Sequence, residues 1–471
     1  MKPCARKGRG ATTTWLASAI LLISVVVAAP AHAAATGYSA RWTKRYDGAA
    51  ADDAAHAIAV SPDGAAVYVT GYSVGKTGGA NYATVAYSTA AGALRWSRRY
   101  DGSAQTGDVS RAIAISPEGS RVFITGRSHG ALTGDDYATV AYDAVTGAQL
   151  WASRYTGPRA GDDEATSLAV SPDGSTVYVT GHSHGTGTGA DYATVAYDAS
   201  TGTERWVTRY NAPAGGDDAA LAIGVSPEGS SVFVTGRTET AAAGIDGTTV
   251  AYEAASGMQR WVRSYNGPGN GNDVLLALGV ATDGTRVFVG GPSVGAGSGT
   301  DFATIAYDAA TGADGWTSRY DGSAGDSDTM TDLAVTPNGS SVVVTGGSRG
   351  TGTGTDYATV AYGAATGMQR WVRRYDGPSH GDDVSTALEA SASSISVTGH
   401  SHGSGTGDDY ATVTYNLSNG ALLHTGRYDG PAHDTDVATD VGGSPDGTTV
   451  FVTGRSAGTS TAYDLATQAL E

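Results

Sequence analysis

Aspartates are the residues of this sequence whose type and spacing could do chemistry. One aspartate recurs every 53 to 55 residues, each time seven residues before the end of a short strand-type run. Hard cations such as Ca²⁺ bind carboxylate and carbonyl oxygens, so a ring of these groups near one mouth of a channel would be a candidate cation site. The alternative is structural, because an aspartate that accepts hydrogen bonds from backbone N–H groups caps its own loop. We favour the loop cap, because a single ligand site usually breaks the symmetry of a repeat. A Ca²⁺ site is kept as the alternative. The eight positions are Asp53, Asp108, Asp163, Asp218, Asp273, Asp328, Asp383 and Asp436.

A second polar position opens a later strand-type run in each unit. The glycine-rich loop before it, such as Gly187-Thr188-Gly189-Ala190-Asp191, resembles the Gly-x-Gly-x-Asp loops of calcium-binding β-rolls. Those rolls repeat about every nine residues, whereas the present loops are about 55 residues apart. An ordinary loop-to-strand turn is therefore favoured over a Ca²⁺ site in each unit. The positions are Asn81, Asp136, Asp191, Asp246, Asp301, Asp356 and Asp409.

Serine and histidine motifs also recur, and their repetition argues against catalysis. Gly-x-Ser-x-Gly, which marks a nucleophile at a strand-to-helix turn in many hydrolases, begins at Gly71 and occurs in six further units, with no helical pattern after it. His182 and His184, and likewise His400 and His402, form His-x-His pairs. The two pairs fall in the third and seventh units, on opposite sides of an eight-unit ring, so they cannot share one metal ion. Two ligands alone favour a solvated loop over a metal site.

Tryptophans give the period of the repeat that must position these side chains. Each unit holds four short strand-type runs, which in the third unit span 168–170, 177–180, 192–197 and 204–210. The first two flank Ser171-Pro172-Asp173-Gly174, a turn in which proline presets φ and glycine tolerates a positive φ. Four short strands in a tandem unit are typical of a propeller blade. The tryptophans are Trp42, Trp96, Trp151, Trp206, Trp261, Trp316 and Trp371, and His424 stands at the eighth position, where we interpret it as drift.

The number of units predicts a closed ring. Hairpin turns and third runs each occur eight times, but the first copy of the fourth run, 41–46, precedes every hairpin, and the last unit has no fourth run after it. The sequence therefore predicts an all-β, eight-bladed β-propeller with four antiparallel strands per blade, closed by the N-terminal strand completing the last blade. An open solenoid would leave both edges unpaired. We expect a single propeller domain over 40–471, preceded by a short lead over 34–39.

A recurring motif links the tryptophans to known propeller families. Residues 141–151 read AYDAVTGAQLW, and the pattern recurs at 196–206 and 306–316. It resembles the tryptophan-docking motif A-x-D-x-x-T-G-x-x-x-W of quinoprotein-like (PQQ-like) propellers, which implies that each tryptophan packs between neighbouring blades and that eight blades are usual. Residues 171–180, SPDGSTVYVT, resemble the YVTN-type repeats of bacterial and archaeal surface proteins. Quinone-dependent dehydrogenases of that fold commonly use a vicinal cysteine pair and a glutamate–asparagine calcium set, and lactonase-type propellers use asymmetric carboxylates and histidines. This sequence offers neither the cysteine pair with its calcium ligands nor an asymmetric group of carboxylates and histidines.

The N-terminus has the features of a secretory signal over residues 1–33. Four basic residues and no acidic ones accompany an apolar run from Trp15 to Ala29, before the small-x-small site Ala31-His32-Ala33. The run is shorter than the ~20 residues of a membrane span, so we expect a secreted, extracellular protein with no membrane insertion after signal removal. Cys4, the only cysteine, lies in the signal, which leaves no thiol chemistry. Removal would change the formal charge from −17 to −21, which argues against nucleic acid as a partner.

The longer loops predict where a partner binds. In a four-stranded meander, the link between units, such as the one with Asp162 and Asp163, and the glycine-rich loop, such as Gly181 to Asp191, lie on one face, here called the long-loop face. Longer loops on a rigid scaffold are the usual place for binding. We therefore predict a monomeric, non-catalytic scaffold that binds a protein or saccharide ligand through this face, with no cofactor other than possible Ca²⁺. The alternative is a quinoprotein-like or lactonase-like enzyme, which would have one deep, asymmetric pocket with converging charged residues.

Overall fold

The computed structural model describes residues 36–48, 51–75, 79–104, 107–240, 244–459 and 462–471. The secretory signal predicted over residues 1–33 lies outside the described residues and stays a prediction. Ala35–Glu471 forms one compact unit, and the described part of it contains strands and turns without helices. Among the same residues, no helix is long and apolar enough to cross a membrane.

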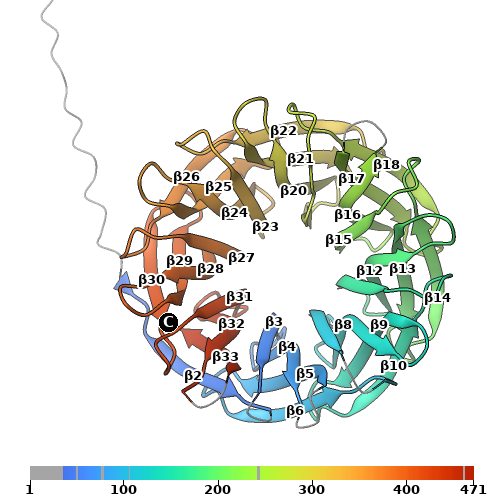
Figure 1. The fold of residues 1–471 in the computed structure, drawn as a ribbon, viewed down its shortest axis with the longest axis horizontal. Coiled ribbons are helices and arrows are strands. Elements are labelled where there is room, and N and C mark those ends of the chain that lie inside the picture. The colour runs from blue at the N-terminus through green and yellow to red at the C-terminus, as the bar shows by residue number, and fades with distance from the viewer. Residues whose placement is uncertain (1–35, 49–50, 76–78, 105–106, 241–243, 460–461) are drawn as a thin grey trace, which may run out of the picture. The chain divides into compact units, whose positions relative to one another are not determined.

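Eight sheets form a ring, and strands such as β3, β15, β23, β27 and β31 lie nearest its centre (Figure 1). Blades one to four, from inner to outer strand, are β3 (Asp53–Val60), β4 (Ala66–Val74), β5 (Ala80–Ser88), β6 (Leu94–Tyr100); β7 (Val109–Ile115), β8 (Arg121–Gly130), β9 (Gly134–Asp143), β10 (Gln149–Tyr155); β11 (Glu164–Val170), β12 (Thr176–His184), β13 (Ala190–Asp198), β14 (Glu204–Tyr210); and β15 (Ala219–Val225), β16 (Ser231–Thr240), β17 (Gly244–Glu253), β18 (Gln259–Tyr265). Blades five to eight are β19 (Ala277–Val280), β20 (Arg286–Val294), β21 (Thr300–Asp308), β22 (Asp314–Tyr320); β23 (Asp328–Val335), β24 (Ser341–Arg349), β25 (Thr355–Gly363), β26 (Gln369–Tyr375); β27 (Asp383–Ala390), β28 (Ser394–His402), β29 (Asp408–Asn416), β30 (Leu422–Tyr428); and β31 (Asp436–Gly443), β32 (Val450–Ala457), β33 (Tyr463–Leu470), β2 (Ala40–Tyr46). The described residues therefore confirm the predicted eight-bladed all-β propeller.

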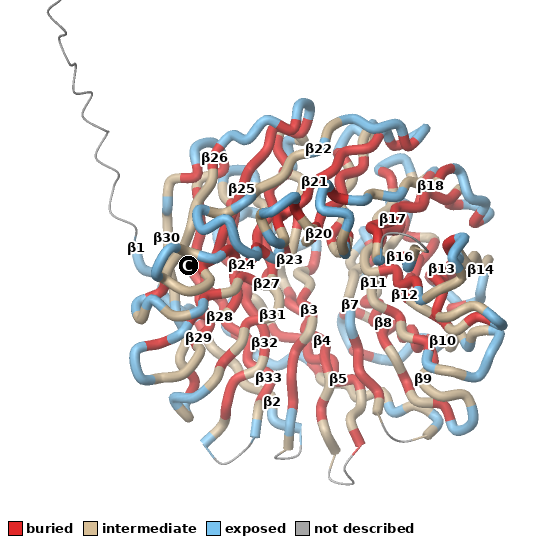
Figure 2. Tube along the Cα trace, turned by 45° about the horizontal axis from the view of Figure 1, so that its top comes forward, coloured by how far each residue is buried: buried red, intermediate tan, exposed pale blue. Residues whose placement is uncertain are grey.

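Local sequence chemistry explains the hairpins inside each blade. In blade three, the N–H of Gly174 donates to the carbonyl of Ser171 at 2.8 Å, and Gly174 has a φ of 70°. The Asp173 carboxylate accepts a hydrogen bond from the N–H of Ser175 at 3.0 Å, which stabilises the turn. Middle strands such as β12 and β13 pair residue by residue and are buried along almost their whole length (Figure 2). Burial on both faces of the middle strands favours the valines, alanines and tyrosines found there.

The hydrophobic core lies between neighbouring blades, and the tryptophans join them. The Trp151 indole of blade two packs between Phe123 and Tyr197, with ring centroids 5.9 Å and 6.3 Å away. Its N–H donates to the Ala199 carbonyl of blade three at 3.1 Å. A Cβ on Gly202 would lie 2.6 Å from the indole, so the glycine of the Thr-Gly turn makes room for the tryptophan of the preceding blade. The predicted packing of tryptophan between blades is confirmed.

Strand β2 closes the ring, as the sequence predicts. It pairs with β33 in antiparallel register, with Trp42 opposite Ala469. The Trp42 indole N–H donates to the carbonyl of Thr89 in blade one at 2.7 Å, and Arg41 contacts the Glu471 carboxylate at 2.6 Å. Closure therefore uses the same strand pairing and tryptophan docking as the covalently continuous blades.

The segment before β2 has a structural role that the sequence did not indicate. Strand β1 (Thr36–Gly37) pairs with β30 in parallel and gives blade seven a fifth strand. The Thr36 hydroxyl lies 2.8 Å from Nδ1 of His424, and the Tyr38 ring stacks 5.0 Å from the same histidine. His424, which we interpreted as drift, thus contacts the N-terminal segment.

Candidate functional site

The eight recurring aspartates, here called the ring aspartates, each stand at the start of an inner strand or one to four residues before it. Asp163 is fully buried; its Oδ2 accepts the N–H of Gly157 at 2.6 Å and its Oδ1 accepts the N–H of His184 at 2.9 Å. All eight accept a backbone N–H from the preceding link at 2.5 to 2.7 Å. Burial raises the pKa of Asp218 to about 6. These are the contacts of a loop cap, and a metal ion at the ring aspartates stays a prediction.

In blades two, three and five to eight, an arginine from the outer strand holds the aspartate at the second polar position. Arg209 Nη2 lies 2.8 Å from Asp191 Oδ2, and Arg209 Nη1 donates to the Ser183 hydroxyl at 2.6 Å. Ser183 is the serine of a Gly-x-Ser-x-Gly motif, so this recurring serine ties strands together. The Thr188 hydroxyl also donates to Asp191 at 3.1 Å and closes the glycine-rich loop. In blade eight this position is held by Asp464, the second residue of β33, which the sequence pattern did not single out. The Oδ1 atoms of the aspartates at this position are buried and accept no hydrogen bond; they belong to Asp136, Asp191, Asp246, Asp301, Asp356, Asp409 and Asp464.

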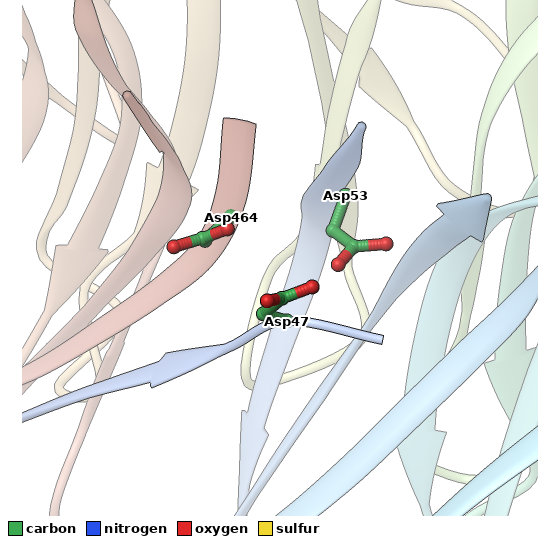
Figure 3. Close-up of side chains that lie close together, drawn as sticks. All are labelled: Asp47, Asp53 and Asp464. Atoms are coloured by element: carbon green, nitrogen blue, oxygen red, sulfur yellow. The ribbon is translucent and has the colours of Figure 1, made fainter. Parts of the chain in front are cut away.

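A third aspartate, which sequence reasoning did not single out, completes four groups at the blade junctions. It follows the outer strand directly, and its carboxylate meets a ring aspartate and an aspartate of the second position. Figure 3 shows Asp47, Asp53 and Asp464 gathered where β2, β3 and β33 meet. In each group, one oxygen of every member lies within 4.8 Å of the others. We call these groups the acidic triads; they are Asp301, Asp321 and Asp328; Asp356, Asp376 and Asp383; Asp409, Asp429 and Asp436; and Asp464, Asp47 and Asp53.

The triads occupy four consecutive junctions, from blades five and six round to blades eight and one. At the other four junctions one member is replaced. Asn81 replaces an aspartate of the second position at the junction with Asp101, and Thr156, Asn211 and Asn266 replace the third aspartate. The ring aspartates are therefore brought together with other aspartates and not with one another in these groups. The asymmetry arises from residues at equivalent positions of the repeat. A comparison of the second and third aspartate positions of all eight units along the sequence would therefore have revealed it.

Three further carboxyl groups break the eightfold pattern on the inner strands of blades six to eight. Asp332 accepts the N–H of Leu388 from the next blade at 2.8 Å, and Asp440 accepts the N–H of Ile58 at 2.8 Å. Glu389 lies on β27 between them. Desolvation raises the pKa of Asp332 to about 6 and the pKa values of Asp440 and Glu389 to about 7. Alanine or serine stands at the position of Asp332 and Asp440 in the other blades, which is the signal that could have found them.

Asp440 predicts a pH dependence of stability. Its folded pKa of about 7 exceeds the ordinary value of 3.8, so between these values the native state binds more protons than the unfolded state. The free energy of unfolding must then fall as the pH rises through this window. We expect Asp440→Asn to raise the free energy of unfolding at pH 8 by about 1 to 2 kcal/mol and to change it little near pH 4. One pKa unit corresponds to about 1.4 kcal/mol, and we reduce the full value because solvent screens part of the interaction.

Urea titrations at the two pH values measure this effect. Asp446→Asn, in a turn of the same blade, is the opposite-sign control, because hydrogen bonds with Ser444 and Thr448 lower the pKa of Asp446. That variant should gain nothing at pH 8. Equal pH slopes for wild type and Asp440→Asn would contradict the prediction.

The histidine pairs stay apart from the acidic triads. Nδ1 of His184 lies 2.8 Å from the Asp162 carbonyl oxygen, and Nδ1 of His402 lies 3.1 Å from the Asp408 carboxylate. Burial lowers the pKa values of His182 and His400. The four groups of potential metal ligands in the described residues contain only aspartates.

Hollows lie between the short turns, on the face opposite the long loops. One, of about 280 Å³, is lined by Ser171, Pro172 and Glu228 among others. Another, of about 270 Å³, is lined by Glu389 and by turn residues of blades six to eight. Two further hollows on this face measure about 320 and 370 Å³, so the four lie near the lower end of the ~300 to 1,000 Å³ of typical ligand pockets.

Comparisons with known proteins agree with this fold. Residues 29–274 match the family model described as outer membrane protein assembly factor BamB. Similar solved structures are quinohemoprotein alcohol dehydrogenase of Comamonas testosteroni (13% identity, 92% of this chain and 76% of that chain, TM-score 0.57) and quinohemoprotein alcohol dehydrogenase ADHIIG of Pseudomonas putida HK5 (14%, 92% and 76%, 0.52). BamB of Moraxella catarrhalis is similar at 14% identity over 92% of this chain and 99% of that chain, with a TM-score of 0.50. No curated protein sequence matches. At these identities the structural likeness shows a common fold.

Proposed function

The chain belongs to the family described as outer membrane protein assembly factor BamB, and from this premise we propose that it is a secreted, non-catalytic scaffold that binds a protein partner through its long-loop face. The family description concerns assembly of proteins, which favours a protein partner over a saccharide. The predicted signal over residues 1–33 supports export. The quinoprotein likeness supplies the fold alone, because a chain with one cysteine cannot provide the vicinal cysteine pair that the resemblance implies for a quinone cofactor.

The observation that carries this proposal is a set of hydrogen bonds that join described loops of the long-loop face to one another. Its loops are tied across blade boundaries: Oδ1 of Asp217, in the link to blade four, accepts the N–H of Ala190 from the glycine-rich loop of blade three at 2.9 Å. Asp382 accepts the N–H of Thr355 in the same way at 2.9 Å. Similar bonds join Asp162 to Asp135 and Asn272 to Ile245, each at 3.2 Å. A preorganised surface loses little conformational entropy on binding.

The charge of this face indicates the chemistry of the partner. Asp162, Asp217 and Asp382 are exposed there, and the whole chain carries a formal charge of −17. Carboxylates arranged on a fixed surface steer a partner of opposite charge and fix its orientation. We therefore expect the bound surface of the partner to be basic and its binding to weaken with salt.

Site-specific photocrosslinking tests the proposal. Leu132, 93% exposed on the loop between β8 and β9, and Val145, 74% exposed on the opposite turn of the same blade, would each be replaced by a photoreactive phenylalanine. With the extracytoplasmic fraction of the source organism, we expect Leu132 to give a discrete protein adduct that unlabelled protein competes away and 0.5 M salt weakens. Equal labelling from both positions, or a glycan array hit without any protein adduct, would overturn it.

A further inference from the structure

The geometry points to a Ca²⁺ site in the acidic triads, formed best by Asp356, Asp376 and Asp383 at the junction of blades six and seven. This inference is independent of the proposed partner. Asp356 is the second residue of β25, Asp376 directly follows β26, and Asp383 opens β27. One carboxylate oxygen from each lies within 4.8 Å of the others. Two oxygens bound to one Ca²⁺ at about 2.4 Å can be at most about 4.8 Å apart, so the three are close enough to share one ion.

Each carboxylate in this triad uses one oxygen for the protein. Arg374 Nη2 holds Asp356 Oδ2 at 2.8 Å, and His380 Nδ1 holds Asp376 Oδ2 at 2.6 Å. The backbone N–H of Gly377 donates to Asp383 Oδ2 at 2.5 Å. These bonds fix the orientation of the three carboxylates before any ion arrives, which is the usual role of groups behind metal ligands.

The second oxygen of each carboxylate has no hydrogen-bond partner. Oδ1 of Asp356, Asp376 and Asp383 are all buried and accept no hydrogen bond. Asp356 and Asp383 are 3% and 0% exposed. Buried carboxylate oxygens without partners are costly, and a hard cation bound by all three would satisfy them together. This unmet bonding capacity, and not the acidity of the cluster, is what indicates a ligand.

The local charge fits a divalent ion. Three aspartates face only two basic groups, the Arg374 guanidinium and the exposed His380 imidazole. The junction therefore keeps an excess of negative charge at neutral pH. Ca²⁺ suits the place better than Mg²⁺, because it accepts irregular sets of carboxylate, carbonyl and water oxygens, whereas Mg²⁺ demands a near-octahedral set.

The next junction repeats the arrangement with different neighbours. Arg427 holds Asp409 at 2.8 Å and His433 holds Asp429 at 2.6 Å, and Oδ1 of both aspartates is again buried without a partner. Here Asp436 uses both oxygens for backbone N–H groups. We therefore expect this second site to be weaker than the first.

The chain itself provides matched variants for the test. Asn211 occupies the place of Asp376 at the junction of blades three and four, beside Asp191 and Asp218. Asp376→Asn therefore makes a junction that the fold already tolerates, and Asn211→Asp builds an additional triad. An exposed aspartate at the start of β22, Asp314, gives a control in Asp314→Asn that removes the same charge outside any triad.

Calorimetric CaCl₂ titration and thermal unfolding of the EDTA-treated protein measure the site. We expect Ca²⁺ to raise the unfolding temperature of wild type, and Asp376→Asn to lose the tightest site or to weaken it at least tenfold. Asp314→Asn should match wild type. Asn211→Asp should unfold at lower temperature in EDTA and recover part of the loss in Ca²⁺. Its added site should bind more weakly than the first, because Asp218 uses both oxygens for backbone N–H groups. Absence of heat and of a thermal shift at millimolar Ca²⁺ would overturn the inference, and so would Asp376→Asn binding Ca²⁺ like wild type or gaining stability regardless of Ca²⁺.

Discussion

A chain that begins at residue 48 and so lacks β2 is expected to lose cooperative folding or to assemble through its open edge. Strand β2 supplies the outer edge of blade eight by pairing with β33, and its Trp42 is 7% exposed between Tyr87 and Phe451. Removal would expose the edge of β33 and the apolar surface under the indole. Unpaired edges template association with other chains, and loss of a buried tryptophan alone costs about 3 to 5 kcal/mol.

Light scattering and thermal unfolding distinguish the outcomes. A chain that begins at residue 40 lacks β1 and retains β2, so it should remain a folded propeller with a modest loss of stability in blade seven. A synthetic peptide of residues 40–47, added to the chain that begins at residue 48, should restore part of the cooperative transition. A monomeric shortened chain that unfolds at the wild-type temperature would contradict the role of β2 in closure.

The architecture could be predicted because its determinants are local and repeated. The turn residues of Ser171 to Gly174 fix a hairpin by their own dihedral preferences, and alternating small and branched residues specify strands buried on both faces. The closure could be predicted because one strand preceded the first hairpin and the last unit lacked its own. Because each weak local signal recurs, the strands of each type could be counted. The counts predicted that the N-terminal strand completes the last blade, in agreement with the pairing of β2 and β33.

The acidic triads could not be predicted in the same way. Asp356, Asp376 and Asp383 lie on three different strands of two blades, and their meeting depends on how closely neighbouring sheets approach. Sequence spacing identified two members and assigned each to its own loop. The free Oδ1 atoms depend on side-chain direction, which no sequence pattern specifies. The parallel pairing of β1 with β30 also leaves no turn motif in the sequence, because short hairpin turns join only antiparallel strands.

Trp151→Ala is expected to lower the free energy of unfolding by about 3 to 5 kcal/mol. The substitution removes ring contacts with Phe123 and Tyr197 and leaves a cavity between blades two and three. It also leaves the carbonyl of Ala199 without the indole N–H. Collapse cannot fill the space, because Gly202 has no side chain to offer there. Denaturant unfolding of the variant measures the loss, and a loss below 1 kcal/mol would contradict the docking role.

His424→Trp is the matched test of why one position of the repeat lacks its tryptophan. Each docked tryptophan contacts the turn between the third and fourth strands of the next blade, as Trp371 does through the carbonyl of Leu417 at 3.0 Å. In blade eight those strands are β33 and β2, which come from opposite ends of this chain, so no hairpin turn joins them and the position contacts Thr36 and Tyr38 instead. A tryptophan at 424 would lose the bond with Thr36 and find no glycine turn to accept it. We therefore expect no gain in stability and weaker protection of β1 in hydrogen exchange, whereas a gain comparable to the loss in Trp151→Ala would show that the docking site exists without the turn.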